Sequence, residues 1–216
     1  MASALTLLAR RQEDVESGDN FNSIPGLKKV ALMSFAAAFK HAMDGGDKEL
    51  KDNADELEFS ARMAQTFAAN TLKDRGASEV LNADQIAAVQ FYTQESVFYP
   101  ILNTRLRDRD RTLVSPFLPF IKLLLSALYT LPRQSVVVFR GVKKNLLTTF
   151  PEGKGKVWWS FSSTTRSLKV LENEMFVGKK GDRTMFHIST TAAIDIGPYS
   201  AFPNEQELVR ACFAVM

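Results

Sequence analysis

Cysteine and histidine are scarce in this chain of 216 residues, and their scarcity limits its chemistry. Cys212 is the only cysteine, and His41 and His187 are the only histidines. A single thiol cannot form an internal disulfide, which favours a reducing compartment over an extracellular one. One cysteine and two distant histidines argue against a zinc site and give little support to a Ser-His-Asp hydrolase. We therefore expect no metal.

The sequence also lacks a long uninterrupted apolar run. The longest one, at residues 117–131, is broken by Pro119 and Lys122 and is too short to span a bilayer. Arg10 and Arg11 follow the short apolar start of the chain rather than precede it, which is the wrong order for a signal peptide. These features predict a soluble protein with no membrane partner, located in a cytoplasm or delivered into one.

Neither sign of charge is in large excess. The 27 Lys and Arg residues against 24 Asp and Glu residues give a net charge of +3. So small a charge does not suit a protein that coats nucleic acid, although it allows weak attraction to phosphate-bearing ligands. We therefore expect no nucleic-acid partner. A hydrophobic content of 45% is ordinary for a soluble globular domain, and the length is enough for one core.

The first half of the chain has the pattern of amphipathic helices. The predicted helices cover residues 27–43, 48–73, a segment from 82 to about 101, and 116–130. Gly76 supplies a stop signal after the second helix, and Asn82 with Gln85 has the spacing of a capping box before the third. In the second helix we expect Leu57 and Met63 to point inward.

The second half has the pattern of strands, because β-branched and aromatic runs alternate there with Gly, Pro and polar turns. The predicted strands are residues 135–140, 156–163, 183–190, 192–196 and 206–215, with one short helix at about 167–176. Helices first and strands second predict an α+β fold, with an N-terminal helical region followed by one mixed or antiparallel β core. No linker separates the halves. We expect a flexible segment at 1–24 and a single domain at 25–216, whose helical part is 25–134 and whose β-rich part is 135–216.

Two motifs in the second half suit an anionic ligand. Arg140 ends an apolar run and is followed by Gly141, so its guanidinium could bind a phosphate through two parallel hydrogen bonds. A hydroxyl cluster at residues 162–165 comes next, and on an extended segment its Ser163 and Thr165 share one side. Taken alone, Arg140 could be an ordinary surface arginine, and the hydroxyls could form a turn before the helix at 167.

A third motif suits a sugar cation. Glu205 and Glu207 are two residues apart, so both carboxylates face one side of a strand. Phe202 precedes them in a loop and could serve as a platform for a planar cation. Alone, the glutamates could lie on a solvated edge strand and Phe202 could fill the core. The order of all three motifs along the chain makes one combined site the better hypothesis.

The ordered set resembles the arginine-specific mono-ADP-ribosyltransferases of the Arg–Ser–Glu class, which includes toxin and eukaryotic members. Residues 139–141 are similar to the family's first motif, 161–165 to its aromatic-x-Ser-Thr-Ser motif, and 202–207 to its loop and Glu-x-Glu motif. This chain also resembles the helical stretch that precedes the core in the family's eukaryotic members, at Tyr92-Thr93, Tyr99, Leu102-Asn103 and Leu106-Arg107. The resemblance covers roughly residues 85–216, and Thr165 stands where the family has a second serine.

The resemblance implies a mixed β-sandwich core of the ADP-ribosyltransferase type. It also implies transfer of ADP-ribose from NAD to arginine side chains of a protein acceptor, with release of nicotinamide. NAD would be the substrate, and no metal would take part. The implied NAD-binding residues are Arg140, Gly141, Ser163, Thr165 and Phe176, of which Phe176 would stack on nicotinamide.

The resemblance also implies the catalytic roles. Glu207 would stabilise the oxocarbenium-like ribose, because it places negative charge where positive charge develops. Ser163 would orient Glu207, with Ser162 as the alternative. Glu205 would bind the acceptor guanidinium beside Phe202 and help to remove its proton, which a charged arginine must lose to become a nucleophile.

Two other functions remain open from the residues alone. The same site could act as an NAD glycohydrolase, with water in place of arginine. The chain could also be a non-catalytic interaction module, although an intact Arg, Ser and Glu set argues against a degenerate site. A retaining glycosidase is less suitable, since two carboxylates on one short strand do not flank a glycosidic bond. The protein target and the role of residues 1–80 cannot be read from the sequence.

Overall fold

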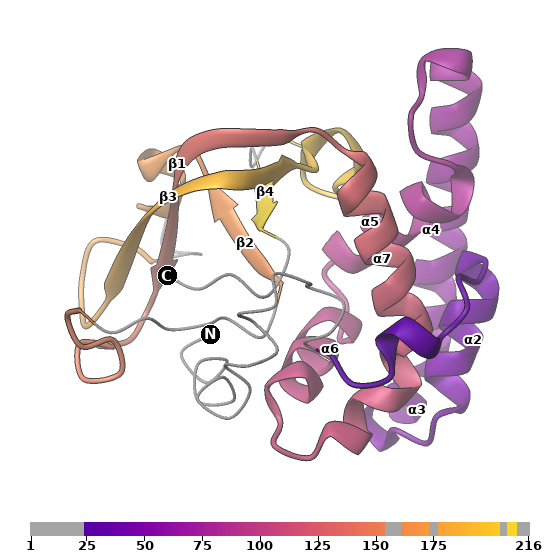
Figure 1. Cartoon of the computed structure of the whole chain (residues 1–216), viewed down its shortest axis with the longest axis horizontal. Coiled ribbons are helices and arrows are strands. Elements are labelled where there is room, and N and C mark those ends of the chain that lie inside the picture. Colours follow the sequence, from indigo (N-terminus) through magenta and orange to yellow (C-terminus); the bar gives the residue numbers. More distant parts are fainter. Residues whose placement is uncertain (1–23, 154–160, 173–176, 204–206, 211–216) are drawn as a thin grey trace.

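The structure is a computed structural model and describes residues 24–153, 161–172, 177–203 and 207–210. The helices are α2 (Phe35–Asp44), α3 (Lys48–Asp52), α4 (Ala54–Arg75), α5 (Ala83–Thr93), α6 (Phe98–Arg107), α7 (Leu118–Thr130) and α8 (Leu168–Leu171). Short 3-10 helices are η3 (Leu27–Lys29), η4 (Gly76–Ser78), η5 (Arg111–Phe117) and η6 (Gly197–Tyr199). The strands are β1 (Arg133–Val142), β2 (Ser162–Thr165), β3 (Thr184–Asp195) and β4 (Glu207–Arg210). The predicted α+β class is confirmed, and Figure 1 shows α7 of the helical half leading into β1.

Local capping explains where the helices differ from the prediction. The first long helix begins at Phe35 and not at residue 27, because Ser34 caps it and Asp84 Oδ1 accepts from Phe35 N at 2.7 Å. The predicted helix at 48–73 is split at Asn53 into α3 and α4. The capping box of α5 is confirmed. That segment nevertheless divides into α5 and α6, because the chain turns to extended geometry at Gln94.

Aromatic packing forms the centre of the helical half. Among the described residues, five phenylalanines are less than 2% exposed: Phe35, Phe91, Phe98, Phe117 and Phe120. Phe98 contacts Phe91 and Phe120 with ring centroids 4.8 Å apart in each pair. Burial of one such side chain stabilises a fold by roughly 1.5–3 kcal/mol. The same hydrophobic cluster continues into the β half through Val138, Ile188 and Leu208.

The most apolar helix of the described residues lies within this core. The segment Arg111–Thr130 is long and apolar enough to cross a membrane, but 61% of its most apolar part is buried inside the protein. A helix that is apolar on all sides is expected at the centre of a large core. Burial of α7 therefore accounts for its composition.

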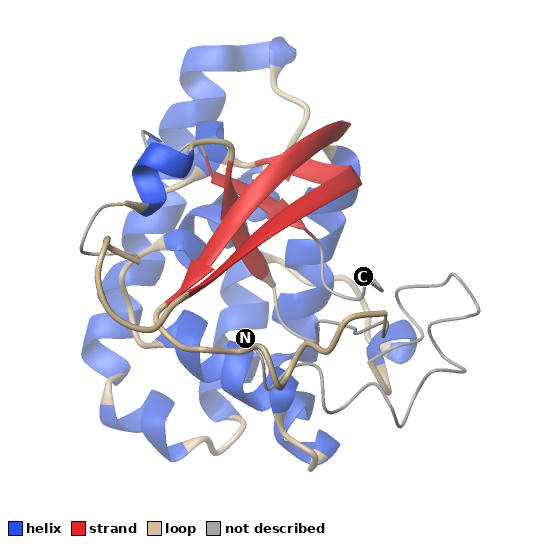
Figure 2. Cartoon of the chain, turned by 90° about the vertical axis from the view of Figure 1, so that its left-hand side faces the viewer, coloured by secondary structure: helices blue, strands red, loops and turns tan. Residues whose placement is uncertain are grey.

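The described strands are all antiparallel and close into a small barrel in the order β1-β2-β4-β3 (Figure 2). Of the two arrangements expected for the core, mixed or antiparallel, the described strands have the antiparallel one. β1 and β3 pair from Arg133↔Ile194 to Val142↔Thr184. β3 is one long strand where two were predicted, because a register shift in β1 between Gln134 and Val136 lets the ladder continue.

Buried residues of both halves belong to one hydrophobic cluster in the described part of the chain, and the single domain at 25–216 stays a prediction. We expect limited proteolysis to cut first within residues 1–24 and to release no stable fragment of residues 135–216. Mass spectrometry of the digest would identify the products. A protease-resistant 135–216 fragment would instead show that the β half folds alone.

Candidate functional site

Strand pairing brings the three sequence motifs onto adjacent strands. Phe139 of β1, next to Arg140, pairs with Thr165 of β2, and Thr165 also pairs with Glu207 of β4. The arginine, the hydroxyl cluster and the second glutamate therefore meet on β1, β2 and β4. Glu205 and Phe176 lie outside the described residues, and Glu207 is described by its backbone alone.

The β2–β4 register relates the hydroxyls to Glu207. Thr165 is directly opposite Glu207, and Ser163 is opposite Val209. Alternation along a strand puts the Cβ atoms of Ser163 and Thr165 on one side of β2 and those of Ser162 and Thr164 on the other. Ser163 is therefore the diagonal neighbour of Glu207 on the same face, a separation of about 7–8 Å between Cα atoms that long side chains can bridge.

Two hydroxyls of the cluster already have structural partners. Thr164 is buried, and its Oγ1 donates to Leu208 O at 2.6 Å. Thr165 is also buried, and its Oγ1 accepts from Ser167 N at 3.1 Å, which fastens the turn into α8. Ser163 is exposed. The described part of the cluster thus combines the turn expected from its composition with an exposed serine, Ser163, on the face of Glu207.

Arg140 links β1 to β2 at Ser163. Its Nη1 donates to Ser163 O at 2.5 Å, beside the one Cα pair that links these strands, Phe139↔Thr165. A hydrogen bond from a charged donor is about twice as strong as a neutral one. The guanidinium is partly buried. Arg140 therefore holds the backbone of the hydroxyl cluster as well as presenting a cation at this edge of β1.

Replacing Arg140 with lysine separates these two roles. Arg140→Lys keeps the charge and one donor for Ser163 O but loses the planar fork. We expect NAD to bind about tenfold more weakly, with little change in the melting temperature of the ligand-free protein. Calorimetric titration with NAD and thermal unfolding provide the two measurements. Unchanged NAD affinity would assign Arg140 to the fold alone.

Gly141 is required by packing. A Cβ atom at this position would lie 1.9 Å from Val177 Cγ2, and Val177 is itself buried. Such an overlap with a buried side chain cannot be relieved without moving the backbone. The absence of a side chain at Gly141 therefore lets the segment that follows Phe176 in sequence pack directly on β1.

Phe202 lies in a short loop that the structure describes at residues 200–203. Its ring is partly exposed and does not belong to the hydrophobic core cluster, so it does not fill the core. Phe202 N donates to Ser200 Oγ at 3.0 Å, and Ala201 N donates to Thr93 Oγ1 of α5 at 2.9 Å. The helical half thus holds the chain just before the Glu-x-Glu motif.

A polar and aromatic wall from α5 and α6 stands beside β2. The rings of Tyr92 and Phe161 meet at 5.3 Å, and Asn103 Nδ2 donates to Tyr92 Oη at 2.9 Å. Asn103 is buried, and its Oδ1 accepts no hydrogen bond among the described residues. A buried acceptor without a donor is costly, which makes this amide a good candidate for contact with a ligand.

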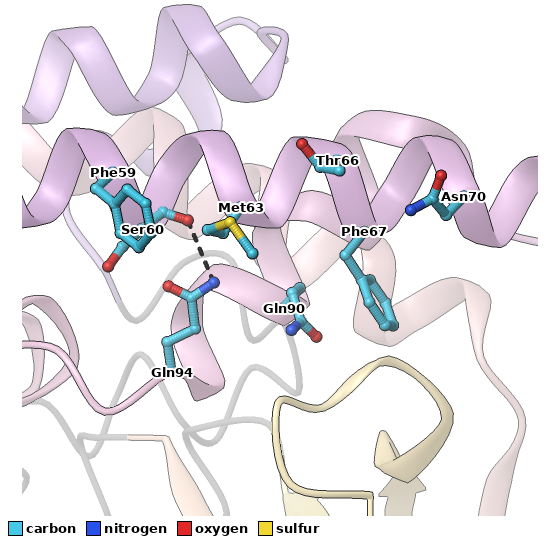
Figure 3. Close-up of a pocket in the computed structure, with 8 residues that line it drawn as sticks. All are labelled: Phe59, Ser60, Met63, Thr66, Phe67, Asn70, Gln90 and Gln94. Atoms are coloured by element: carbon cyan, nitrogen blue, oxygen red, sulfur yellow. Dashed lines mark hydrogen bonds between the residues drawn. The ribbon is translucent and has the colours of Figure 1, made fainter.

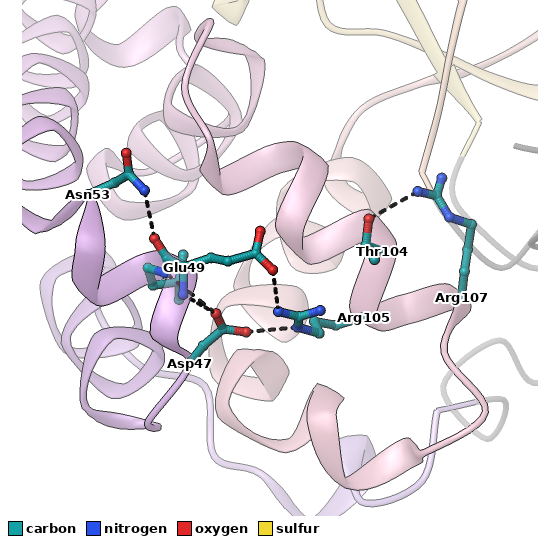
Figure 4. A network of polar contacts seen from close by, with 7 residues as sticks. Asp47, Glu49, Asn53, Thr104, Arg105 and Arg107 are labelled. Atoms are coloured by element: carbon teal, nitrogen blue, oxygen red, sulfur yellow. Dashed lines mark hydrogen bonds and ion pairs between the residues drawn. The ribbon is translucent and has the colours of Figure 1, made fainter.

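Arg107 of α6 adds a cation to this wall. Figure 4 shows that it points away from Arg105, which pairs with Asp47 at 2.8 Å and with Glu49 at 2.9 Å. Arg107 donates to Thr104 Oγ1 at 3.2 Å and has no carboxylate partner within the described ranges. Burial lowers its pKa, and the nearby Tyr99 and Tyr92 partly oppose this. Leu106-Arg107 is part of the helical stretch that resembles the family, but no sequence pattern indicated a role for Arg107 in the site.

A pocket of about 420 Å³ lies between α4 and α5, apart from the three motifs. In Figure 3, Phe59, Met63 and Phe67 of α4 lie on the side that faces α5. Gln90 of α5 and Gln94, just after the end of α5, also line the pocket. Met63 is 49% exposed, so the prediction that it points inward was wrong. The lining has no charged group, which does not suit a dinucleotide diphosphate. This pocket is therefore not the NAD site.

Comparison with known proteins identifies the family. Residues 30–215 match the family described as ART, NAD:arginine ADP-ribosyltransferase. The chain belongs to this family. A search of curated protein sequences finds no significant match.

Solved structures share the fold of this ADP-ribosyltransferase. The eukaryotic mono-ADP-ribosyltransferase ART2.2 is similar with a TM-score of 0.63 and 20% identity, over 84% of this chain and 76% of that one. The type III effector XopAI from Xanthomonas axonopodis pv. citri has a TM-score of 0.60 and 16% identity, over 97% and 88%. The ADP-ribosyltransferase Vis from Vibrio splendidus has a TM-score of 0.51 and 23% identity, over 73% and 76%.

Membership of the ADP-ribosyltransferase family identifies NAD as the donor of the ADP-ribose group. The chain transfers ADP-ribose from NAD, which is consumed as a substrate. Among the described residues, no group of three or more His, Cys, Asp or Glu side chains could hold a metal ion.

Proposed function

We propose that this ADP-ribosyltransferase modifies arginine side chains of a protein acceptor. The observation that carries the proposal is the adjacency of β1, β2 and β4, which gathers Arg140, the hydroxyl cluster and Glu207. The Glu-x-Glu motif follows a loop that presents Phe202. Vis, which shares the fold, has been crystallised with agmatine, a small arginine mimic, and this supports the same class of acceptor.

The residues divide between donor and acceptor. Arg140 and the pair Asn103 and Arg107 would hold the charged and polar parts of NAD, with Phe176 stacking on nicotinamide. Arg107 fits this role because a partly buried cation without a carboxylate partner can bind phosphate oxygens. Gly141 would serve by letting the chain near Phe176 pack closely on β1.

Glu207 would act at the bond that breaks. The bond from ribose C1′ to nicotinamide breaks with its electron pair leaving on the nicotinamide nitrogen, and the ribose develops positive charge. A carboxylate held there stabilises that charge. The β2–β4 register supports Ser163, rather than Ser162, as the serine that orients Glu207, since only Ser163 shares its face. Thr165, directly opposite, would support the same carboxylate.

Glu205 would act on the nucleophile. A guanidinium nitrogen attacks C1′, forms the new C–N bond and loses a proton, which a nearby carboxylate can accept. Phe202 would pack on the flat face of the guanidinium, an arrangement that favours a cation over an aromatic ring. The acceptor would be a protein of the cytoplasm in which the enzyme acts.

Incubation with NAD tests the proposal directly. Free nicotinamide and ADP-ribosyl-agmatine would be measured in parallel, with and without agmatine. Formation of ADP-ribosyl-agmatine supports arginine transfer. Nicotinamide release with free ADP-ribose as the sole product, unaffected by agmatine, would instead support an NAD glycohydrolase. No consumption of NAD by the folded protein would mean a non-catalytic module.

A further inference from the structure

A buried carboxylate joins the end of α4 to the segment that precedes Phe202. Glu79 Oε1 accepts from Tyr199 Oη at 2.6 Å, from Val80 N at 2.8 Å and from Leu81 N at 3.0 Å. Its Oε2 accepts from Arg75 Nη1 at 2.9 Å. The Glu79 side chain is only 2% exposed, whereas the Arg75 side chain is 39% exposed, so the carboxylate is shielded from water and the arginine is partly open to it. We call Arg75, Glu79 and Tyr199 the clamp.

Arg75 makes the clamp two-sided. Its second nitrogen, Nη2, donates to Pro198 O at 3.2 Å, and its guanidinium carbon lies 5.2 Å from the centre of the Tyr199 ring. Arg75 thus contacts the backbone before Tyr199, the ring of Tyr199 and the carboxylate of Glu79, to which Tyr199 donates. Contacts across 120 residues of sequence fix η6 against the helical half.

The protonation states match these bonds at neutral pH. Burial raises the pKa of Glu79, but hydrogen bonds from Tyr199, Leu81, Arg75 and Val80 outweigh it and leave the pKa below its usual value. Burial, the hydrogen bond to Glu79 and the charge of Glu79 raise the pKa of Tyr199 to about 12. Glu79 is therefore charged and Tyr199 protonated, as a donor to a carboxylate must be.

The clamp stands immediately before the acceptor side of the proposed site. Tyr199 ends η6, and the next residues are held by bonds from Ala201 N to Thr93 Oγ1 and from Phe202 N to Ser200 Oγ. Phe202 is partly exposed, whereas Tyr199 and Ser200 are buried. The chain thus passes from a fixed anchor to an accessible aromatic ring within three residues. None of the three NAD-binding motifs contacts the clamp in the described bonds.

We infer that Glu79 and Tyr199 are positioning residues that hold the residues 200–203 loop for capture of the acceptor, without a part in cleaving NAD. The inference rests on the proposed arginine transfer. If the loop that carries Phe202 were free to move, it would have to become ordered each time an acceptor binds. Anchoring the loop in advance lowers this free-energy cost of binding. The expected signature is a change in acceptor KM with the NAD reaction intact.

Tyr199→Phe is the sharpest test. The variant keeps the ring under Arg75 and leaves Glu79 with its two backbone donors and Arg75, so it should fold. We expect the KM for agmatine to rise about tenfold, because the variant loses one hydrogen bond to a charged group. The KM for NAD and the rate of nicotinamide release without agmatine should stay within about twofold of the wild-type values.

Two further variants control for a general loss of stability. Glu79→Ala should raise the KM for agmatine at least as much as Tyr199→Phe, and the double variant should add little to it, because both changes remove the hydrogen bond from Tyr199 Oη to Glu79. Asp44→Asn breaks an exposed pair with Lys40 that has the same four-residue spacing as Arg75 and Glu79. It should leave both activities unchanged. A parallel fall in NAD cleavage and agmatine transfer in Tyr199→Phe would overturn the inference, as would no change in either.

Hydrogen exchange separates the clamp from the choice of acceptor. In Tyr199→Phe the amides of Ala201 and Phe202 should exchange faster, while the amides of the β1–β3 ladder keep their protection. If the wild-type enzyme proved unable to modify agmatine, arginine transfer would fail, and the exchange rates would still decide whether the clamp holds this loop. Unchanged exchange at Ala201 and Phe202 would refute the positioning role in either case.

Discussion

Glu207→Gln is expected to slow nicotinamide release by a factor of about 100 or more, because it removes the negative charge that would stabilise the ribose cation. Glutamine has nearly the same shape and can still bond a hydroxyl. Residue 207 pairs directly with Thr165 and diagonally with Ser163, so a neutral amide there keeps the same neighbours. Transfer to agmatine should fall by a similar factor, since both reactions break the same bond. Initial rates at saturating NAD would measure both.

A matched glutamate provides the control for this prediction. Glu58 lies on α4, is exposed and forms only a weak pair with Arg62 at 4.0 Å. Glu58→Gln removes the same charge away from β1, β2 and β4 and should leave both rates unchanged. Circular dichroism and the melting temperature would show that Glu207→Gln remains folded. Near-normal nicotinamide release from that folded variant would contradict the assignment.

The helical half could be predicted as far as its signals are local. The capping box of Asn82 and Gln85 and the end of α4 at Gly76 are interactions within a few residues, and both are present. The start of α2 at Phe35 depends on Asp84, which is 49 residues away. The split at Asn53 places α3 so that its cap, Asp47, meets Arg105 of α6. Such distant partners leave no periodic pattern in the sequence.

The β half shows the same limit in another form. Strand composition identified β1 and the two parts of β3, but pairing and register depend on residues far apart in the chain. The closed antiparallel order β1-β2-β4-β3 follows from ladders such as Thr165↔Glu207, which join segments 42 residues apart. Alternation of side chains predicted only that Ser163 and Thr165 share a face. The register adds which face Glu207 shares.

Residues that support the site were the hardest to predict. Arg140 was singled out for its guanidinium, yet its bond to Ser163 O depends on the meeting of β1 and β2. The need for Gly141 comes from Val177, which approaches it from a distant segment. Glu79 and Tyr199 have no motif and lie 120 residues apart. The types of residue and their order along the sequence can therefore suggest a reaction. The contacts that hold those residues in place are seen only in the folded structure.

The choice of acceptor is proposed to depend on Glu205, and substitution of this glutamate has the second large expected effect. Glu205→Gln should reduce modification of agmatine by a factor of about 100 or more, because the guanidinium loses both its charged partner and its proton acceptor. Nicotinamide release without agmatine should stay within about threefold of wild type, since water needs no such partner and Glu207 is retained. High-performance liquid chromatography of nicotinamide, ADP-ribose and ADP-ribosyl-agmatine from one reaction would measure all three products.

The pattern of losses across the two glutamates separates their roles. If Glu205→Gln lost both activities in proportion, Glu205 would belong to the machinery that cleaves NAD, as Glu207 is proposed to. If it lost neither, arginine would not be the acceptor, and the glycohydrolase would become the better function. Loss of transfer alone, with Glu207→Gln losing both, would place the two carboxylates of one Glu-x-Glu motif on successive steps. Glu207 would then act on the ribose as nicotinamide leaves, and Glu205 on the guanidinium as the new bond to C1′ forms.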